Sequence, residues 1–144
     1  MPTQLGTSDF SIVLPEGYTL TEDELSEDQV AYYYKDDNSM DFDVYQWEKD
    51  DQYSLESEAN AYADYYGTTA EAVTVNGING MKYISVEEYD AVSYTVANYM
   101  FEDDTYIVEL SFWTDDSAEE YAVVDEILAT LKKNWFWFVL GDVA

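Results

Sequence analysis

The chain has 144 residues, of which 32 are Asp or Glu, 5 are Lys, and none is Arg, His or Cys, so its formal net charge is −27. A surface this acidic repels nucleic-acid phosphates, whose binding depends on Lys and Arg, and we therefore expect no nucleic-acid partner. The missing residue types exclude disulfides, thiolate nucleophiles and histidine bases, while a hydrophobic content of 47% is too high for a disordered chain.

The first predicted elements are β-strands. Residues 9–14 form an apolar run that stops at a turn, because Pro15 fixes φ at the second turn position and Gly17 occupies the fourth. An acidic loop leads to a second strand over residues 30–36, and residues 39–49 then alternate between apolar and polar side chains. The polar and aromatic face of this third strand carries Asp41, Asp43, Tyr45 and Trp47.

The spacing of apolar residues then changes to that of a helix. In residues 54–67 apolar side chains recur every three or four positions, Ser54 suits the N-cap, and Gly67 suits the position after the C-cap. Strands return between residues 71 and 114. An Asn-Gly pair at residues 76–77 marks a turn there, and the last two long strands form a hairpin.

The last predicted helix spans residues 117–133. Ser117 and Glu120 form a capping box, apolar residues recur at spacings of three and four, and Lys132 and Lys133 suit the negative end of the helix dipole. The order of strands, helix, strands and helix, with hairpin-like connections, indicates an α+β fold with an antiparallel β-sheet.

The segment 134–144 departs from this pattern, because its apolar residues, with Trp135 and Trp137 among them, would lie on all sides of a helix. Two interpretations stay open: a final turn or strand docked on its own domain, or an interface in a homodimer or with another protein. The segment is too short for a membrane span. We therefore divide the chain into a single domain over residues 1–133 and an apolar C-terminal tail over residues 134–144.

The order of these motifs resembles the PsbP-like α/β/α sandwich. The resemblance rests on Leu-Pro-Glu-Gly-Tyr at residues 14–18, on the aromatic strands within residues 30–47, on the Asn-Gly turn and on the closing helix. It covers about residues 9–133, and its motifs belong to the fold rather than to an active site. The chain looks most like the small, acidic, exported versions from Gram-positive anaerobic bacteria.

This resemblance implies a three-layer arrangement, in which helices pack on an antiparallel sheet. It also implies a non-enzymatic domain that binds or supports a partner, as in photosystem II accessory proteins and a Ran-binding nuclear import factor. We accordingly expect an unidentified protein or cell-surface partner, and an extracellular or cell-envelope location with a signal peptide that is not among these residues. No functional residue of those relatives matches a position of this chain.

Residues 36–48 carry oxygen-bearing side chains at alternate positions, among them Asp37, Asp41 and Asp43, which is the ligand spacing of a calcium loop. Such a loop also requires glycine where this chain has Phe42, and it curls, whereas the alternation demands an extended backbone. We therefore interpret the stretch as an acidic turn that runs into a strand, and we expect no cofactor. A weaker Ca²⁺ site at the three aspartates stays open as the alternative.

Aromatic rings beside carboxylates predict a binding face on the third strand. Tyr45 and Trp47 lie on it, and the neighbouring strand adds either Tyr33 or the pair Tyr32 and Tyr34, because alternate residues face the same way. Such a face can grip sugars or cationic ligands by stacking and cation–π attraction. The alternative is that a helix covers the face and the rings belong to the core.

Catalysis by this chain would depend on carboxylates, because histidine and cysteine are absent. A pair of acids could hydrolyse glycans, but 32 acids supply many pairs and no nucleophile motif marks one of them. We therefore expect a non-catalytic binding or accessory domain and no enzymatic activity. The alternatives are a carboxylate-based glycan hydrolase and an assembly module that associates through the tail.

Overall fold

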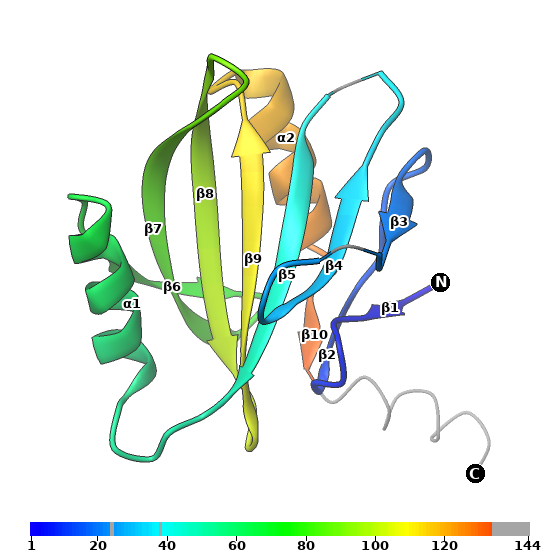
Figure 1. Cartoon of the computed structure of the whole chain (residues 1–144). Coiled ribbons are helices and arrows are strands. Elements are labelled where there is room, and N and C mark those ends of the chain that lie inside the picture. Colours follow the sequence, from blue (N-terminus) through cyan, green and yellow to red (C-terminus); the bar gives the residue numbers. More distant parts are fainter. Residues whose placement is uncertain (24, 38, 134–144) are drawn as a thin grey trace, which may run out of the picture.

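The computed structural model describes residues 1–23, 25–37 and 39–133 (Figure 1). Within them, one sheet has the strand order β3-β4-β5-β9-β8-β7-β6 and a smaller sheet has the order β1-β2-β10, and all neighbouring strands are antiparallel. The strands are β1 (Thr3–Gln4), β2 (Phe10–Ile12), β3 (Thr19–Thr21), β4 (Gln29–Tyr34), β5 (Asp41–Glu48), β6 (Glu71–Val75), β7 (Ile78–Tyr89), β8 (Val92–Glu102), β9 (Tyr106–Thr114) and β10 (Lys132–Lys133).

Two helices lie on opposite faces of the large sheet in the described part of the chain. Helix α1 (Leu55–Tyr65) runs beside β7 and β8, whereas α2 (Ala118–Leu128) packs on the other face together with the small sheet (Figure 1). The predicted α+β fold, with helices on both sides of an antiparallel sheet, is confirmed.

The main hydrophobic core lies between the large sheet and α2. Phe42 and Val44 of β5 pair with Phe112 and Leu110 of β9, and all four side chains are fully buried on this face. The rings of Phe42 and Phe112 lie 5.0 Å apart. Burial of each such side chain stabilises the fold by about 1.5–3 kcal/mol, so these alternate positions fix the register of the central strands.

Helix α1 covers only part of the opposite face. Its buried residues are the small Ala59 and Ala63, which allow the helix to lie close to Met81 of β7 and Met100 of β8. Ile107 of β9 belongs to the same cluster, but the next two residues on this face of β9, Glu109 and Ser111, are polar. The face therefore changes from a helix-covered apolar region to a polar floor.

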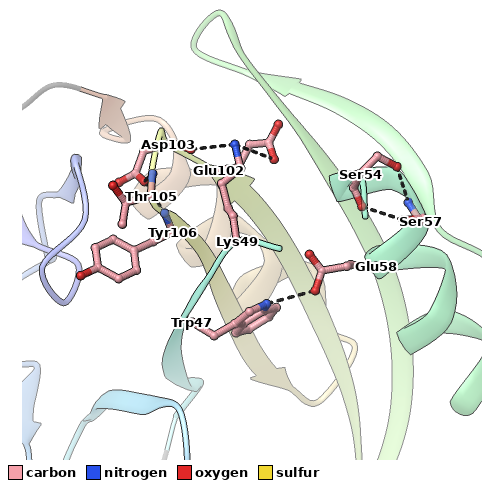
Figure 2. Close-up of polar contacts among 9 residues, drawn as sticks. All are labelled: Trp47, Lys49, Ser54, Ser57, Glu58, Glu102, Asp103, Thr105 and Tyr106. Carbon is pink, nitrogen blue, oxygen red and sulfur yellow. Dashed lines mark hydrogen bonds and ion pairs between the residues drawn. The ribbon is translucent and has the colours of Figure 1, made fainter. Parts of the chain in front are cut away.

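The segment between β5 and α1 is held at both ends (Figure 2). Trp47 donates its indole N–H to Glu58 Oε1 of α1 at 3.2 Å, and Lys49 donates to the carbonyl oxygen of Asp103 at 3.1 Å. Ser54 is the predicted N-cap, and its hydroxyl accepts from the Ser57 N–H at 3.0 Å. These contacts fix where α1 starts and how it lies over the sheet.

The prediction of a last helix that continues to residue 133 is wrong. α2 ends at Leu128, and Lys132 and Lys133 instead form β10, which pairs with Ser11 and Phe10 of β2. The cause is a contact that is remote in sequence: Asn76, in the β6–β7 turn, donates to three backbone carbonyl oxygens at the end of the helix. These belong to Leu128, Ala129 and Leu131, at 3.0, 2.8 and 3.1 Å.

No helix among the described residues is both long enough and apolar enough to span a membrane.

Candidate functional site

The polar floor of the α1 face is built by four neighbouring strands. Tyr45 of β5 pairs with Glu109 of β9, Ser111 of β9 pairs with Asn98 of β8, and Asn98 pairs with Tyr83 of β7. Because directly paired residues in antiparallel strands point to the same face, these five side chains form one continuous patch.

Glu109 is the most unusual member of this patch, because it is a carboxyl that is only 7% exposed. The Tyr83 hydroxyl donates to its Oε2 at 2.9 Å, and the Ser111 hydroxyl lies 3.3 Å from its Oε1. Burial raises the pKa of Glu109 to about 7, and the hydrogen bond from Tyr83 offsets only part of that rise. The carboxyl is therefore part protonated near neutral pH.

Ser111 connects Glu109 to a second buried group. Its hydroxyl contacts Asn98 Oδ1 at 2.7 Å, a shorter distance than the one to Glu109. A hydroxyl has a single proton to donate, so it goes to Asn98, and protonated Glu109 can in turn donate to the Ser111 oxygen. The Asn98 amide donates to the hydroxyl of Ser85 at 3.1 Å. The floor is a hydrogen-bonded network rather than a set of separate polar groups.

Asp43 is a second buried carboxyl on the same face, 8% exposed. Gln29 donates to its Oδ1 at 2.6 Å, and the indole N–H of Trp113 donates to its Oδ2 at 3.0 Å. Burial raises the pKa of Asp43 to about 6, and the negative charges of Asp41 and Glu87 add to the rise. Both of its oxygens are thus held in place by donors of the protein.

A cavity of about 260 Å³ lies above this floor and beside α1. Tyr62 of α1 and Tyr66, the C-cap residue of this helix, form one wall, and their ring centroids lie 6.4 and 6.2 Å from that of Tyr83, on which they stack. The cavity is lined by Glu27, Asp28, Tyr45, Trp47, Tyr62, Tyr66, Tyr83, Glu87, Asn98, Glu109, Ser111 and Trp113, and we call it the inner cavity. Its walls are therefore aromatic and its floor is acidic.

A second hollow of about 470 Å³ lies on the same face, and we call it the outer hollow. It is lined by Gln29, Tyr32, Asp41, Asp43, Tyr89, Tyr94 and Trp113. Tyr32 donates to Asp41 Oδ2 at 2.6 Å, and the Tyr94 ring meets Trp113 edge to face at 5.6 Å. Trp113 lines both the inner cavity and the outer hollow, so the two adjoin at its side chain.

A third hollow of about 400 Å³ lies on the α2 side, between β6 and the end of the helix. It is lined by Glu71, Val73, Thr74, Val75, Asn76, Lys82, Tyr99, Asp125, Leu128 and Ala129. None of its charged residues is buried, and its lysine lies over the Tyr99 ring, 5.3 Å from the centroid. Without a buried charged group it lacks what distinguishes the α1 face.

The predicted binding residues do not all lie on the same face of the sheet. Tyr45 and Trp47 line the inner cavity. Tyr33 lies on the α2 face, where it is 2% exposed and its ring stacks on Phe42 at 4.9 Å, so it belongs to the core. The pair Tyr32 and Tyr34 lies on the α1 face in its place, because Tyr32 pairs with Asp43. Trp135 and Trp137 lie outside the described residues.

The three aspartates considered for calcium have separate surroundings. Asp37 is exposed and accepts from the backbone N–H of Ser39 at 3.0 Å, as in a turn. Asp41 and Asp43 lie on β5 and accept hydrogen bonds from side chains of neighbouring strands. Among residues 1–23, 25–37 and 39–133, no group of three or more acidic side chains is arranged to hold a metal ion.

Sequence reasoning missed the central residue, Glu109. The available signal was the alternation of β9, in which Glu109 and Ser111 interrupt a strand that is otherwise apolar on both faces. A carboxyl in the middle of a long central strand must either be solvated or have partners. The partner that identifies it as buried, Tyr83, lies 26 residues away and was not predictable from the pattern of β9 alone.

Comparisons with known proteins bear on the fold. No family model matches the sequence, and no curated protein matches it. The solution structure of cyanobacterial PsbP (CyanoP) from Synechocystis sp. PCC 6803 is similar with a TM-score of 0.68 and 8% identity, over 92% of this chain and 91% of that one.

A crystal structure of a protein from Bacteroides thetaiotaomicron VPI-5482 is also similar, with a TM-score of 0.62 and 20% identity over 87% of this chain. The match covers 45% of the Bacteroides chain, so this chain spans less than half of that protein. Identities this low establish the fold alone. The predicted resemblance is confirmed at that level: the chain has the PsbP-like α+β fold.

Proposed function

We propose that this chain is a non-catalytic binding domain whose site is the inner cavity and whose ligand is a small organic molecule with a positive charge. The observation that carries the proposal is the buried Glu109 carboxyl on the floor of a cavity with tyrosine and tryptophan walls. Ligand sites are typically concave, largely aromatic or apolar, and supplied with a few fixed polar groups.

The chemistry of this lining favours cations. Aromatic rings attract a cation to their faces, and the attraction strengthens when water is excluded. A cation beside Glu109 would also favour the ionised carboxyl, which burial alone disfavours. Neutral sugars would gain from the rings but not from the charge, and anions would be repelled by Glu87 and Asp43.

A binding role fits the surroundings of the carboxyls better than catalysis. Both oxygens of Asp43 accept from Gln29 and Trp113, and Glu109 contacts Tyr83 and Ser111. Groups fixed in this way provide a stationary negative potential. We retain the expected extracellular or cell-envelope location as part of this proposal.

The test is a titration followed by NMR of the indole N–H groups, with choline chloride as the probe and sodium chloride at equal ionic strength as the reference. We expect choline to shift the Trp47 and Trp113 signals specifically, and Glu109→Gln to weaken binding by about tenfold, which is 1.4 kcal/mol. Glu126→Gln, on the exposed side of α2, is the matched control and should bind as the wild type does. Equal shifts with both salts would contradict the proposal.

A second candidate, a carboxylate-based glycan hydrolase, is favoured by one observation. Asp43 and Glu109 are buried on the same face, with pKa values raised to about 6 and about 7. Near neutral pH Asp43 is therefore mostly ionised, while Glu109 is about half protonated. Release of reducing ends from a glycan panel, with loss of activity in Glu109→Gln, would establish the hydrolase and replace the binding proposal. A panel without turnover would eliminate it.

A further inference from the structure

We infer that the ligand is a linear polyamine that lies across both the inner cavity and the outer hollow, with its ammonium groups near Glu109, Asp43 and Asp41 and its methylene chain along the tyrosine and tryptophan rings. This inference rests on the proposed function and specifies its ligand. It is carried by the arrangement of the two hollows, which share the Trp113 side chain and one sheet face.

The acidic groups follow one another along the strands at a regular interval. Glu109 is paired with Tyr45, Asp43 is two residues further along β5, and Asp41 is two residues beyond it. Asp43 and Asp41 are alternate residues of one strand, about 7 Å apart, and Glu109 of β9 is the diagonal neighbour of Asp43, about 7–8 Å away. These spacings are comparable to the short methylene chains that separate successive ammonium groups of a polyamine. Each charge of the ligand would therefore meet its own carboxyl.

The aromatic residues of the outer hollow match the rest of such a ligand. Tyr32, Tyr94 and Trp113 are partly exposed there, and Tyr89, at the end of the β7–β8 hairpin, is 66% exposed. A ligand with a single charge that filled the inner cavity would leave these rings and Asp41 unused. Methylene groups laid on the rings would bury apolar surface on both partners.

A basic peptide suits this surface less well than a polyamine. Peptide N–H and C=O groups need hydrogen-bond partners when they are buried. The polar groups of the floor are already engaged with one another, through Gln29 with Asp43, Tyr32 with Asp41, and Asn98 with Ser85. A polyamine has donors but no carbonyl oxygens, so it needs only the remaining acceptor capacity of the carboxylates.

Charge favours the same ligand class. The chain as a whole carries a formal net charge of −27. Lys35 lines a hollow of about 370 Å³ that shares Tyr32, Asp41 and Trp113 with the outer hollow, and its Nζ lies over the Tyr18 ring, 5.0 Å from the centroid. None of the residues that line the inner cavity or the outer hollow is a lysine, and Lys35, in the adjoining hollow, is held over the Tyr18 ring.

The experiment is isothermal titration calorimetry of the full chain with spermidine, with butylamine as the single-charge probe, in about 0.15 M sodium chloride to screen diffuse attraction. We expect spermidine to bind with a stoichiometry of one and about tenfold more tightly than butylamine. Asp41→Asn should weaken spermidine about tenfold and butylamine by much less, whereas Glu109→Gln should weaken both by similar factors. Asn can still accept from Tyr32, so the fold should survive.

The controls separate the inference from the proposed function. Asp125→Asn removes the same charge from the exposed side of α2 and should leave both affinities as they are. If it weakens spermidine as much as Asp41→Asn does, the binding is diffuse and the inference fails. If the two amines bind equally and Asp41→Asn has no effect, the site takes a single cation, so the inference fails while the proposed function stands. If neither amine binds, the inference fails, and the choline titration decides the proposed function separately.

Discussion

Glu109 is a carboxyl for which ionisation is costly in the folded state. Its pKa rises from 4.5 to about 7, which corresponds to about 3 kcal/mol. Between these two pH values the folded state keeps a proton that the unfolded state has lost. The free energy of unfolding therefore falls as pH rises through this window. Above pH 7 it is lower by the whole of this difference.

The variant Glu109→Gln tests this statement at the level of one residue. Its amide carries no charge at any pH, so we expect the difference in unfolding free energy between variant and wild type to shift in favour of the variant by about 3 kcal/mol from pH 4.5 to 7.5. Urea unfolding at a series of pH values measures it. Glu126→Gln removes the same charge at an exposed position and should show no such trend. A parallel trend in both variants would contradict the explanation by a buried charge.

Individual residues of the site also show why some of them were predictable from the sequence and others were not. Alternation along β5 is local, so the shared face of Asp43, Tyr45 and Trp47 followed from the sequence. The choice between Tyr33 and its neighbours depended on how β4 pairs with β5, and a shift of one residue reverses every side chain. Burial of Glu109 depends on four neighbouring strands and on α1, which no local pattern contains.

At the scale of elements, Asn76 joins two parts of the fold. It occupies a turn position with a φ of 51°, followed by Gly77 with a φ of 77°, which is the geometry expected of the predicted Asn-Gly turn. Its side-chain amide also donates to the carbonyl oxygens that end α2. Helix ends leave such carbonyl oxygens without partners inside the helix. The β6–β7 turn therefore caps the C-terminal end of α2.

We expect Asn76→Asp to destabilise the fold by about 1–2 kcal/mol, because a carboxylate cannot donate and would repel the carbonyl oxygens. Aspartate tolerates positive φ, so the turn itself should remain. The measurement is the urea midpoint at constant slope. Asn79→Asp is the matched control, since Asn79 accepts from Thr74 and aspartate still can. Equal losses in the two variants would mean that charge, and not the cap, is responsible.

The elements themselves were largely predictable. The caps of α1 and the start of α2 are local signals, and both serine hydroxyls accept the expected backbone N–H. The end of α2 was not predictable, since its helical spacing of apolar residues continues to Leu131 while the backbone turns away at Leu128. Tertiary contacts from Asn76 and pairing with β2 outweigh the helical pattern there.

At the scale of the whole molecule, the net charge of −27 opposes compactness. The range of these repulsions shortens from about 30 Å at 0.01 M salt to about 10 Å at 0.1 M. We expect added sodium chloride to raise the unfolding temperature by about 3 °C, the shift that 1 kcal/mol gives in a domain near this size. Calorimetry measures it, and an unfolding temperature that does not respond to sodium chloride would contradict this view.

Calcium chloride at the same ionic strength separates screening from ion binding. We expect it to give the same rise as sodium chloride, because Asp37, Asp41 and Asp43 do not converge on one point among the described residues. A larger, chelator-sensitive rise with calcium would show that the folded state binds the ion. That result would restore the cation site at these aspartates.

The small sheet β1-β2-β10 has a consequence for how the chain folds. β2 comes before the seven strands of the large sheet in sequence, yet one of its edges is completed only by Lys132 and Lys133. Contacts between such distant segments are slow to form, because the entropy cost of closing a long loop comes before any stabilising contact is made. In a nascent chain, β2 with Phe10 and Ile12 would therefore lack this neighbouring strand until residue 133 has left the ribosome. The core can therefore close over Phe10 and Ile12 only after Lys132 and Lys133 have left the ribosome.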